Sequence, residues 1–88
     1  MPKISEFYGI KIYIYWNDNQ HHKLPHFHAY YSEHIAAFDL KGNLLIGKMP
    51  KRAKKLIKAW ALEKSSELMY AWTCAEELKA LPVIEGLK

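Results

Sequence analysis

The stretch "HFHAYYSEHIAAFDLKGNLLIGK", residues 26–48, decides the fold. It contains three runs of strand-forming residues, at 26–31, 35–40 and 44–48. In the first two runs the apolar side chains recur at every second position, which is the period of a β-strand. The connections "SEH" and "KGN" are three residues each, and the second contains residues that tolerate a positive φ in a hairpin turn. Because parallel neighbours need a crossover of about a dozen residues, these short connections predict an antiparallel meander.

Another strand is predicted upstream, at residues 10–16. The sequence "IKIYIYW" alternates isoleucines with lysine and tyrosines, and it ends in Trp16. One face of this strand carries Ile10, Ile12, Ile14 and Trp16, and the other carries Lys11, Tyr13 and Tyr15. The following residues, "NDNQHHKLP", are typical of a turn and a loop. The sheet is therefore expected to have four strands.

Two helices are predicted after the sheet. Pro50 suits the first turn of a helix, and apolar residues recur behind it at spacings of three and four, at Ala53, Leu56, Ile57, Trp60 and Ala61. The sequence "KSSE" indicates a break, where Ser65 or Ser66 is a candidate N-cap. The second helix is expected to end before Pro82 and to turn inward Leu68, Ala71, Trp72, Ala75 and Leu78.

The sequence thus predicts one small α+β domain over residues 1–88, an antiparallel four-stranded meander with two C-terminal helices packed on one face. The tail "VIEGL" is expected to form either a short edge strand or an irregular segment. An open meander has unpaired edges, so edge pairing into a homodimer is a further expectation.

Export and membrane insertion are not expected. The first residues alternate instead of forming the apolar run of a signal peptide, and no stretch has the roughly 18 uncharged apolar residues of a membrane span. Cys74 is the single cysteine, which favours a reducing compartment. A cytoplasmic location is therefore the prediction.

Positive charge is concentrated in one segment. The chain has a formal net charge of +4, but residues 41–64 alone hold eight basic residues and one acidic residue. Four lysines share one side of the first predicted helix, with Arg52 and Lys48 nearby: Lys51, Lys54, Lys55 and Lys58. Like charges at this spacing cost a few tenths of a kcal/mol per pair, so helix stability does not explain them. A solvated face is one interpretation, and a surface for nucleic acid or an acidic protein is the other.

All five histidines lie within residues 21–34, and two of them, His26 and His28, share one face of the predicted strand. Alternation with Phe27 and Ala29 predicts that both imidazoles point away from the core. Two imidazoles at this spacing can chelate a metal ion, with further ligands to be drawn from Asp18, His21, His22 and His34. They can also be exposed or hydrogen-bonded residues with a structural role.

The remaining hypothesis is acid–base chemistry on RNA. One imidazole would take a proton from a ribose 2′-hydroxyl, and the other would give one to the leaving 5′-oxygen. A lysine or arginine would hold the phosphate. Three tyrosines are expected on the same exposed face, where aromatic rings stack on single-stranded bases: Tyr13, Tyr15 and Tyr30.

The order of motifs resembles the small bacterial family catalogued as domain of unknown function 4160. The resemblance rests on "ISEFYGIKIYIYWND", "PHFHAYY", the alanine-containing strand, "GNLLIGKMPKRA" and "LIKAW", and Pro25–His28 is its most specific part. Residues 17–25 are longer and richer in histidine than is usual in the family. Such proteins are often encoded beside a second small protein, in an arrangement suggestive of a toxin–antitoxin pair. The resemblance therefore implies a cognate small protein as a partner.

The predicted function is a toxin-like component of a two-gene module that acts on RNA in preference to DNA. His26 and His28 are the candidate catalytic pair, and no cofactor is expected. The candidate nucleic-acid-binding residues are Lys48, Lys51, Arg52, Lys54, Lys55, Lys58, Tyr13, Tyr15 and Tyr30. The alternative is a non-catalytic module that binds nucleic acid or a protein partner, such as a transcriptional regulator or an antitoxin, with structural histidines.

Overall fold

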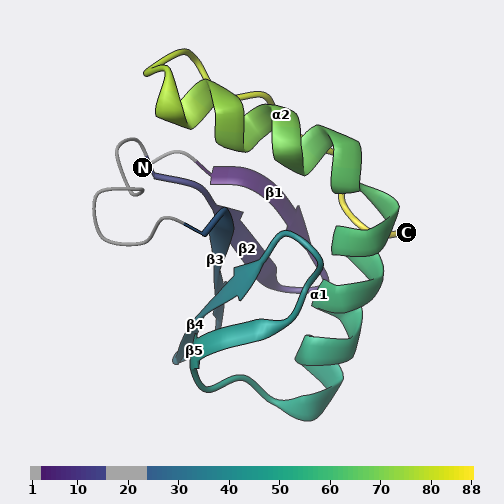
Figure 1. Cartoon of the computed structure of the whole chain (residues 1–88). Coiled ribbons are helices and arrows are strands. Elements are labelled where there is room, and N and C mark those ends of the chain that lie inside the picture. The colour runs from purple at the N-terminus through teal and green to yellow at the C-terminus, as the bar shows by residue number, and fades with distance from the viewer. Residues whose placement is uncertain (1–2, 16–23) are drawn as a thin grey trace.

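The computed structural model describes residues 3–15 and 24–88. It contains a sheet followed by two helices (Figure 1). The elements are β1 (Lys3–Phe7), β2 (Ile10–Tyr13), β3 (His26–Tyr31), β4 (His34–Asp39), β5 (Leu44–Gly47), α1 (Lys51–Glu63) and α2 (Ser65–Glu76). The α+β class, the antiparallel sheet and the two C-terminal helices are as predicted.

The sheet has five strands, so the expected number of four is wrong. All neighbours are antiparallel, and the spatial order β1-β2-β3-β4-β5 is that of a meander. The additional strand, β1, joins β2 through a two-residue turn in which Tyr8 and Gly9 both have positive φ. Such a turn matches the twist of a hairpin. β2 ends at Tyr13, which is shorter than predicted, and Trp16 lies outside the described residues.

Strand register divides the sheet into two faces. Ile12, Ala29 and Ala36 are aligned across β2, β3 and β4, and all three are buried. Their sequence neighbours Tyr13, His28 and Ala37 are aligned in the same way, and alternation places them on the opposite face. We call the first the helix face and the second the outer face.

The helix face packs on α1 and α2. Trp60 of α1 is completely buried, and its ring contacts Phe7 of β1 and Phe27 of β3 at centroid distances of 5.2 and 5.5 Å. α2 adds a second set of buried side chains: Leu68, Ala71, Trp72, Cys74 and Ala75. The predicted inward position of Leu78 is wrong, because α2 ends at Glu76 and Leu78 is exposed.

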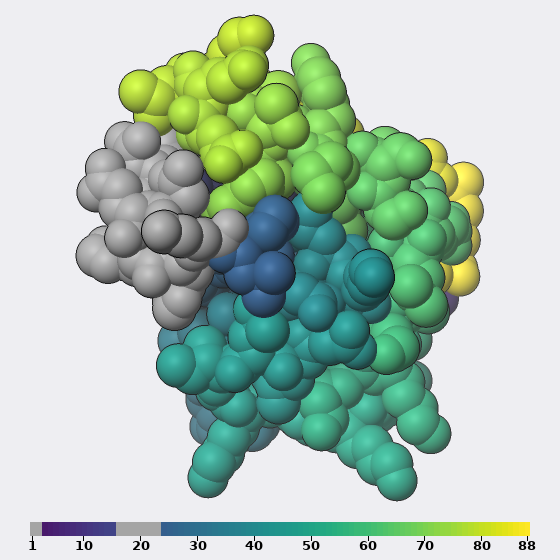
Figure 2. All heavy atoms as spheres, in the orientation of Figure 1, coloured from purple at the N-terminus to yellow at the C-terminus, as the bar shows by residue number. Residues whose placement is uncertain are grey.

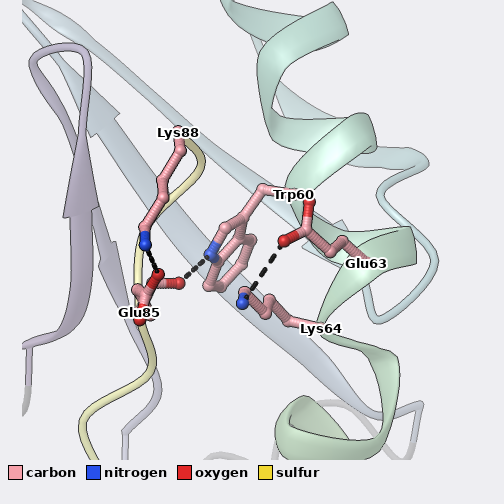
Figure 3. Close-up of polar contacts among 5 residues, drawn as sticks. All are labelled: Trp60, Glu63, Lys64, Glu85 and Lys88. Carbon is pink, nitrogen blue, oxygen red and sulfur yellow. Dashed lines mark hydrogen bonds and ion pairs between the residues drawn. The ribbon is translucent and has the colours of Figure 1, made fainter.

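The C-terminal segment 81–88 forms no strand, but it runs beside β1. The backbone N–H of Ile84 donates a hydrogen bond of 2.7 Å to the carbonyl oxygen of Ile4. The indole N–H of Trp60 donates one of 3.0 Å to the carbonyl oxygen of Glu85, and the Glu85 side chain pairs with Lys88 (Figure 3). The segment is therefore hydrogen-bonded to both the sheet and α1. Among the described residues, no helix is long and apolar enough to cross a membrane.

Candidate nucleic-acid interface

The basic side of α1 faces a groove beside the turn between β4 and β5. α1 buries Ala53, Ile57, Trp60 and Ala61 against the sheet, which leaves the lysines on its other sides. The groove has a volume of about 340 Å³. Its lining residues come from α1, from the turn and from the two strands: Lys51, Lys54, Lys55, Lys58, Phe38, Gly42, Asn43 and Leu44. We call this hollow the basic groove. Figure 2 shows the teal surface of the β4–β5 hairpin and the green surface of α1 adjoining each other.

A network of hydrogen bonds holds the turn against α1. Asp39 Oδ1 accepts bonds from the backbone N–H groups of Lys41 and Asn43, each at 2.9 Å. Asn43 Nδ2 donates to Asp39 Oδ2 at 3.1 Å, and Lys58 Nζ donates to Asn43 Oδ1 at 2.7 Å. These bonds fix one wall of the basic groove relative to the other.

The Asp39 carboxyl is charged within this network. Its partial burial favours the neutral form, but the hydrogen bonds from the backbone and side chain of Asn43 and from the Lys41 backbone outweigh burial and lower the pKa of Asp39. The carboxylate is therefore already engaged by amide donors and is not among the groove's lining residues.

Positive charge in the basic groove is not balanced by acidic side chains. The lining residues include four ammonium groups and no carboxylate. The ion pairs found in the described parts of the chain lie elsewhere: Lys3–Glu6, Lys64–Glu63, Lys79–Glu77 and Lys88–Glu85. The groove therefore attracts anions.

Two of the predicted basic residues lie outside the basic groove. Lys48 is exposed between β5 and α1, and it is not among the lining residues. Arg52 points to another hollow, where it lies with Tyr8, Ile10 and Tyr31. The structure thus brings together four of the six predicted cations.

The three predicted tyrosines do meet, but on the outer face. The hydroxyl oxygens of Tyr15 and Tyr30 are 2.7 Å apart and share a hydrogen bond. The Tyr13 ring lies parallel to that of Tyr15 at 6.1 Å and meets the edge of Tyr30 at 5.0 Å. All three rings are half-buried, because they pack on one another. The sheet separates them from the lysines of α1.

Both imidazoles were predicted to point away from the core, but His26 is buried. Only 1% of His26 is exposed, and its Nδ1 is hydrogen-bonded to the carbonyl oxygen of Leu24 at 2.8 Å. The ring lies 5.1 Å from that of Trp72, so α2 contacts the start of β3. Alternation predicted the correct face of the strand but did not reveal this contact.

His28 is half-buried on the outer face. Its ring lies 4.9 Å from Tyr15 and 5.2 Å from His26, measured between centroids. The two histidines are therefore adjacent, as predicted. The lysines of α1, which were expected to hold the phosphate, do not share a groove with them, because α1 packs on the helix face and none of the residues that line the basic groove is a histidine.

The proposed metal ligands are not brought together in the described part of the chain. His34 pairs with Tyr31, at the opposite end of the β3–β4 hairpin from His26, which pairs with Asp39. Asp18, His21 and His22 lie outside the described residues. Among residues 3–15 and 24–88, no group of three side chains of the metal-binding types gathers around one point.

Sequence reasoning missed a second groove, next to β5 on the outer face. It has a volume of about 210 Å³ and is lined by Leu24, His26, Ala37, Leu45 and Ile46. We call it the apolar groove. The signal in the sequence was the uncharged run "LLI" at residues 44–46, because an edge strand usually carries charges that discourage pairing.

The comparisons with known proteins bear on the family alone. Neither the curated proteins nor the solved structures include a match to this chain. The model of one family, described as Domain of unknown function (DUF4160), matches residues 9–73. This span contains β2 to β5, all of α1 and most of α2, and therefore both walls of the basic groove. The chain belongs to the DUF4160 family.

Proposed function

We propose that this protein is a non-catalytic module that binds nucleic acid through the basic groove. The observation that carries the proposal is the set of four ammonium groups that line one hollow without a carboxylate among them. Lysine side chains supply the sequence-independent attraction for phosphates that dominates most nucleic-acid affinities.

The spacing of the lysines suits a run of phosphates. Lys51 and Lys58 are seven residues apart on α1, which corresponds to about 10 Å along the helix axis. Flexible lysine stems extend this reach on either side, so the groove can contact more than one phosphate of a strand. Lys58 is also held by Asn43, which keeps its ammonium group at the wall of the groove.

Cleavage of RNA by His26 and His28, within a toxin-like two-gene module, stays a prediction with less support. An acid–base pair must reach both the 2′-hydroxyl and the leaving oxygen. His26 is buried, and the groove that attracts phosphate lies across the sheet from His28. The preference for RNA over DNA also stays a prediction, because the tyrosines that favour single strands lie on the other face.

The proposal is tested with fluorescent single-stranded oligonucleotides of RNA and DNA, whose binding is followed by anisotropy between about 50 and 200 mM salt. The double charge reversal Lys54→Glu/Lys55→Glu should weaken binding roughly tenfold or more. It should also reduce the slope of log affinity against log salt by about 1.4, because each lost contact with a single strand accounts for about 0.7.

The control for charge reversal outside the basic groove is Lys79→Glu, at an exposed lysine beyond the end of α2. It changes the charge at one residue but leaves the basic groove intact, so its salt slope should equal that of the wild type. An unchanged slope in the Lys54→Glu/Lys55→Glu variant, or equal losses in both variants, would contradict binding through the groove.

A further inference from the structure

The two edges of the sheet differ in how they are covered. The β1 edge is accompanied by the C-terminal segment, through the bond from Ile84 to Ile4 and a close contact between Gly86 and Glu6 (Figure 1). β5 is the other edge strand, and among the described residues its backbone pairs only with β4. An edge strand presents backbone N–H and C=O groups to a further strand. The sheet is therefore open to pairing at β5.

The side chains of β5 lack the usual protection of an edge. Leu45 and Ile46 are 44% and 63% exposed, and all four residues of the strand are uncharged. Natural edge strands are guarded by charges, prolines, a covering segment, β-bulges or short length. β5 is short and its register with β4 shifts between Ala37 and Phe38, but its side chains carry no charge. Lys48 follows the strand but does not interrupt it. An exposed apolar edge of this kind is typical of a binding site for a partner strand.

A strand added at β5 would have a groove on each side of it. Leu44 lies in the wall of the basic groove on the helix face, whereas Leu45 and Ile46 lie in the wall of the apolar groove on the outer face. The register shift between β4 and β5 places the consecutive residues Leu45 and Ile46 at the same groove. In a regular added strand, successive side chains point to opposite faces of the sheet. Alternate side chains of the added strand would therefore enter the basic groove and the apolar groove in turn.

We propose that β5 is a strand-addition site for a partner polypeptide in which acidic and apolar residues alternate. Its carboxylates would meet the lysines of α1, and its apolar side chains would cover Leu45 and Ile46. The backbone bonds to β5 would supply binding that does not depend on the partner's side chains. This site goes beyond nucleic-acid binding, since it uses main-chain groups and the outer face.

A second copy of this chain is a poorer occupant of the edge. Antiparallel pairing of two β5 strands about a two-fold axis would bring Lys48 of each copy alongside the start of the other strand. Residues 41–64 carry eight basic residues against one acidic residue, so the two surfaces would repel each other. Charge complementarity therefore favours an acidic strand over a copy of the same protein.

The probe is a nine-residue capped peptide of alternating valine and glutamate. Two derivatives are N-methylated, one at every valine and one at every glutamate. In an extended strand these two sets of N–H groups point to opposite edges, so each derivative can pair along one edge only. We expect the parent peptide and one derivative to bind, and the other derivative to lose at least tenfold in affinity. Equal binding by both derivatives would overturn strand addition.

Amide hydrogen exchange locates the binding site. The exchange of amides in residues 44–47 should slow on addition of the parent peptide, whereas amides of β1 should not change. The same exchange is measured without peptide at several protein concentrations. If exchange at residues 44–47 slows as the protein concentration rises, and sedimentation shows a dimer, then a second copy of the chain occupies the edge. Both that result and the absence of peptide binding would overturn the proposal.

Matched substitutions distinguish peptide binding at β5 from oligonucleotide binding in the basic groove. Ile46→Lys places a charge in the apolar groove and should weaken peptide binding at least tenfold. Ile35→Lys is its control, because Ile35 is also an exposed isoleucine, lies on β4 and lines neither groove. Ile46→Lys should leave oligonucleotide binding intact, so failure of strand addition can be told from failure of nucleic-acid binding. Equal effects of both substitutions on peptide binding would overturn the assignment to β5.

Discussion

Gly42, in the turn between β4 and β5, lies so close to α1 that a Cβ atom on it would come within 2.7 Å of the Lys58 Cα atom. Its φ of +85° also lies in the region that side chains rarely adopt. The turn and the helix therefore meet backbone to backbone, and this contact sets the width of the basic groove.

Replacement of Gly42 should destabilise the protein more than replacement of another positive-φ glycine. Gly9 has a similar φ of +80°, but a Cβ atom there would meet only the Tyr31 ring, at 3.5 Å. Gly9→Ala should cost about 1–2 kcal/mol for the backbone conformation alone, and Gly42→Ala clearly more, because α1 must shift. Urea denaturation measures both, and equal losses would contradict the close approach of turn and helix.

The Asp39 network predicts a specific loss of stability in acid. Because the folded protein lowers the pKa of Asp39, the resulting stabilisation is present above the ordinary pKa of an aspartate, near 4, and is lost as the pH falls through the lower folded value. Asp39→Asn should therefore be less stable than the wild type at neutral pH, and the difference should shrink below about pH 4.

Urea denaturation across this pH range checks the Asp39 prediction. Glu33→Gln, in the exposed turn between β3 and β4, controls for the loss of one negative charge. A difference between wild type and Asp39→Asn that stays constant from neutral pH into acid would show that the hydrogen bonds to the carboxylate do not contribute as described.

The C-terminal segment should contribute to stability through one buried side chain. Ile84 is 3% exposed, whereas its neighbour Val83 is 85% exposed. Ile84→Ala should lower the free energy of unfolding by about 2–4 kcal/mol, and Val83→Ala should change it by no more than about 0.5 kcal/mol. Thermal or urea denaturation gives both values. Similar values would mean that the segment does not pack on the sheet in solution.

The two histidines should differ in their effect on folding. His26→Ala removes a buried ring from Trp72 and should cost about 2 kcal/mol or more, while His28→Ala should cost less because His28 is half-buried. His26→Phe keeps a ring against Trp72 but loses the hydrogen bond to Leu24, so an intermediate loss is expected.

The same histidine variants decide the catalytic question. Folded His28→Ala protein should bind the oligonucleotides as the wild type does, and neither protein should shorten a labelled RNA. RNA cleavage by the wild type that disappears in folded His28→Ala protein would support the acid–base hypothesis and refute a non-catalytic function.

Much of the fold is predictable because it depends on local patterns. Alternation in residues 26–31 and 35–40 gave β3 and most of β4, and the apolar spacing behind Pro50 gave α1. β1 was missed for two physical reasons. An irregularity between Lys3 and Ser5 makes Ile4 and Ser5 both buried, which breaks the alternation. The turn also places Tyr8 at positive φ, where Asn or Gly is the usual signal.

The candidate site was predictable only in part, because it depends on contacts between distant segments. The lysine cluster is visible in the sequence, since helical spacing puts its members on one side of α1. The burial of His26 is not visible there, because it results from Trp72, which is 46 residues further along the chain. The apolar groove also depends on tertiary structure, because Leu24 and Ile46 meet only after β3, β4 and β5 have paired.

The position of residues 81–88 beside β1 limits the stoichiometry of any assembly that extends the sheet. With that side occupied by the chain's own terminus, growth can proceed from β5 alone. Head-to-tail addition, in which β5 of one copy pairs with β1 of the next, is therefore blocked. The same molecule can thus keep an apolar strand at its surface without polymerising into fibres.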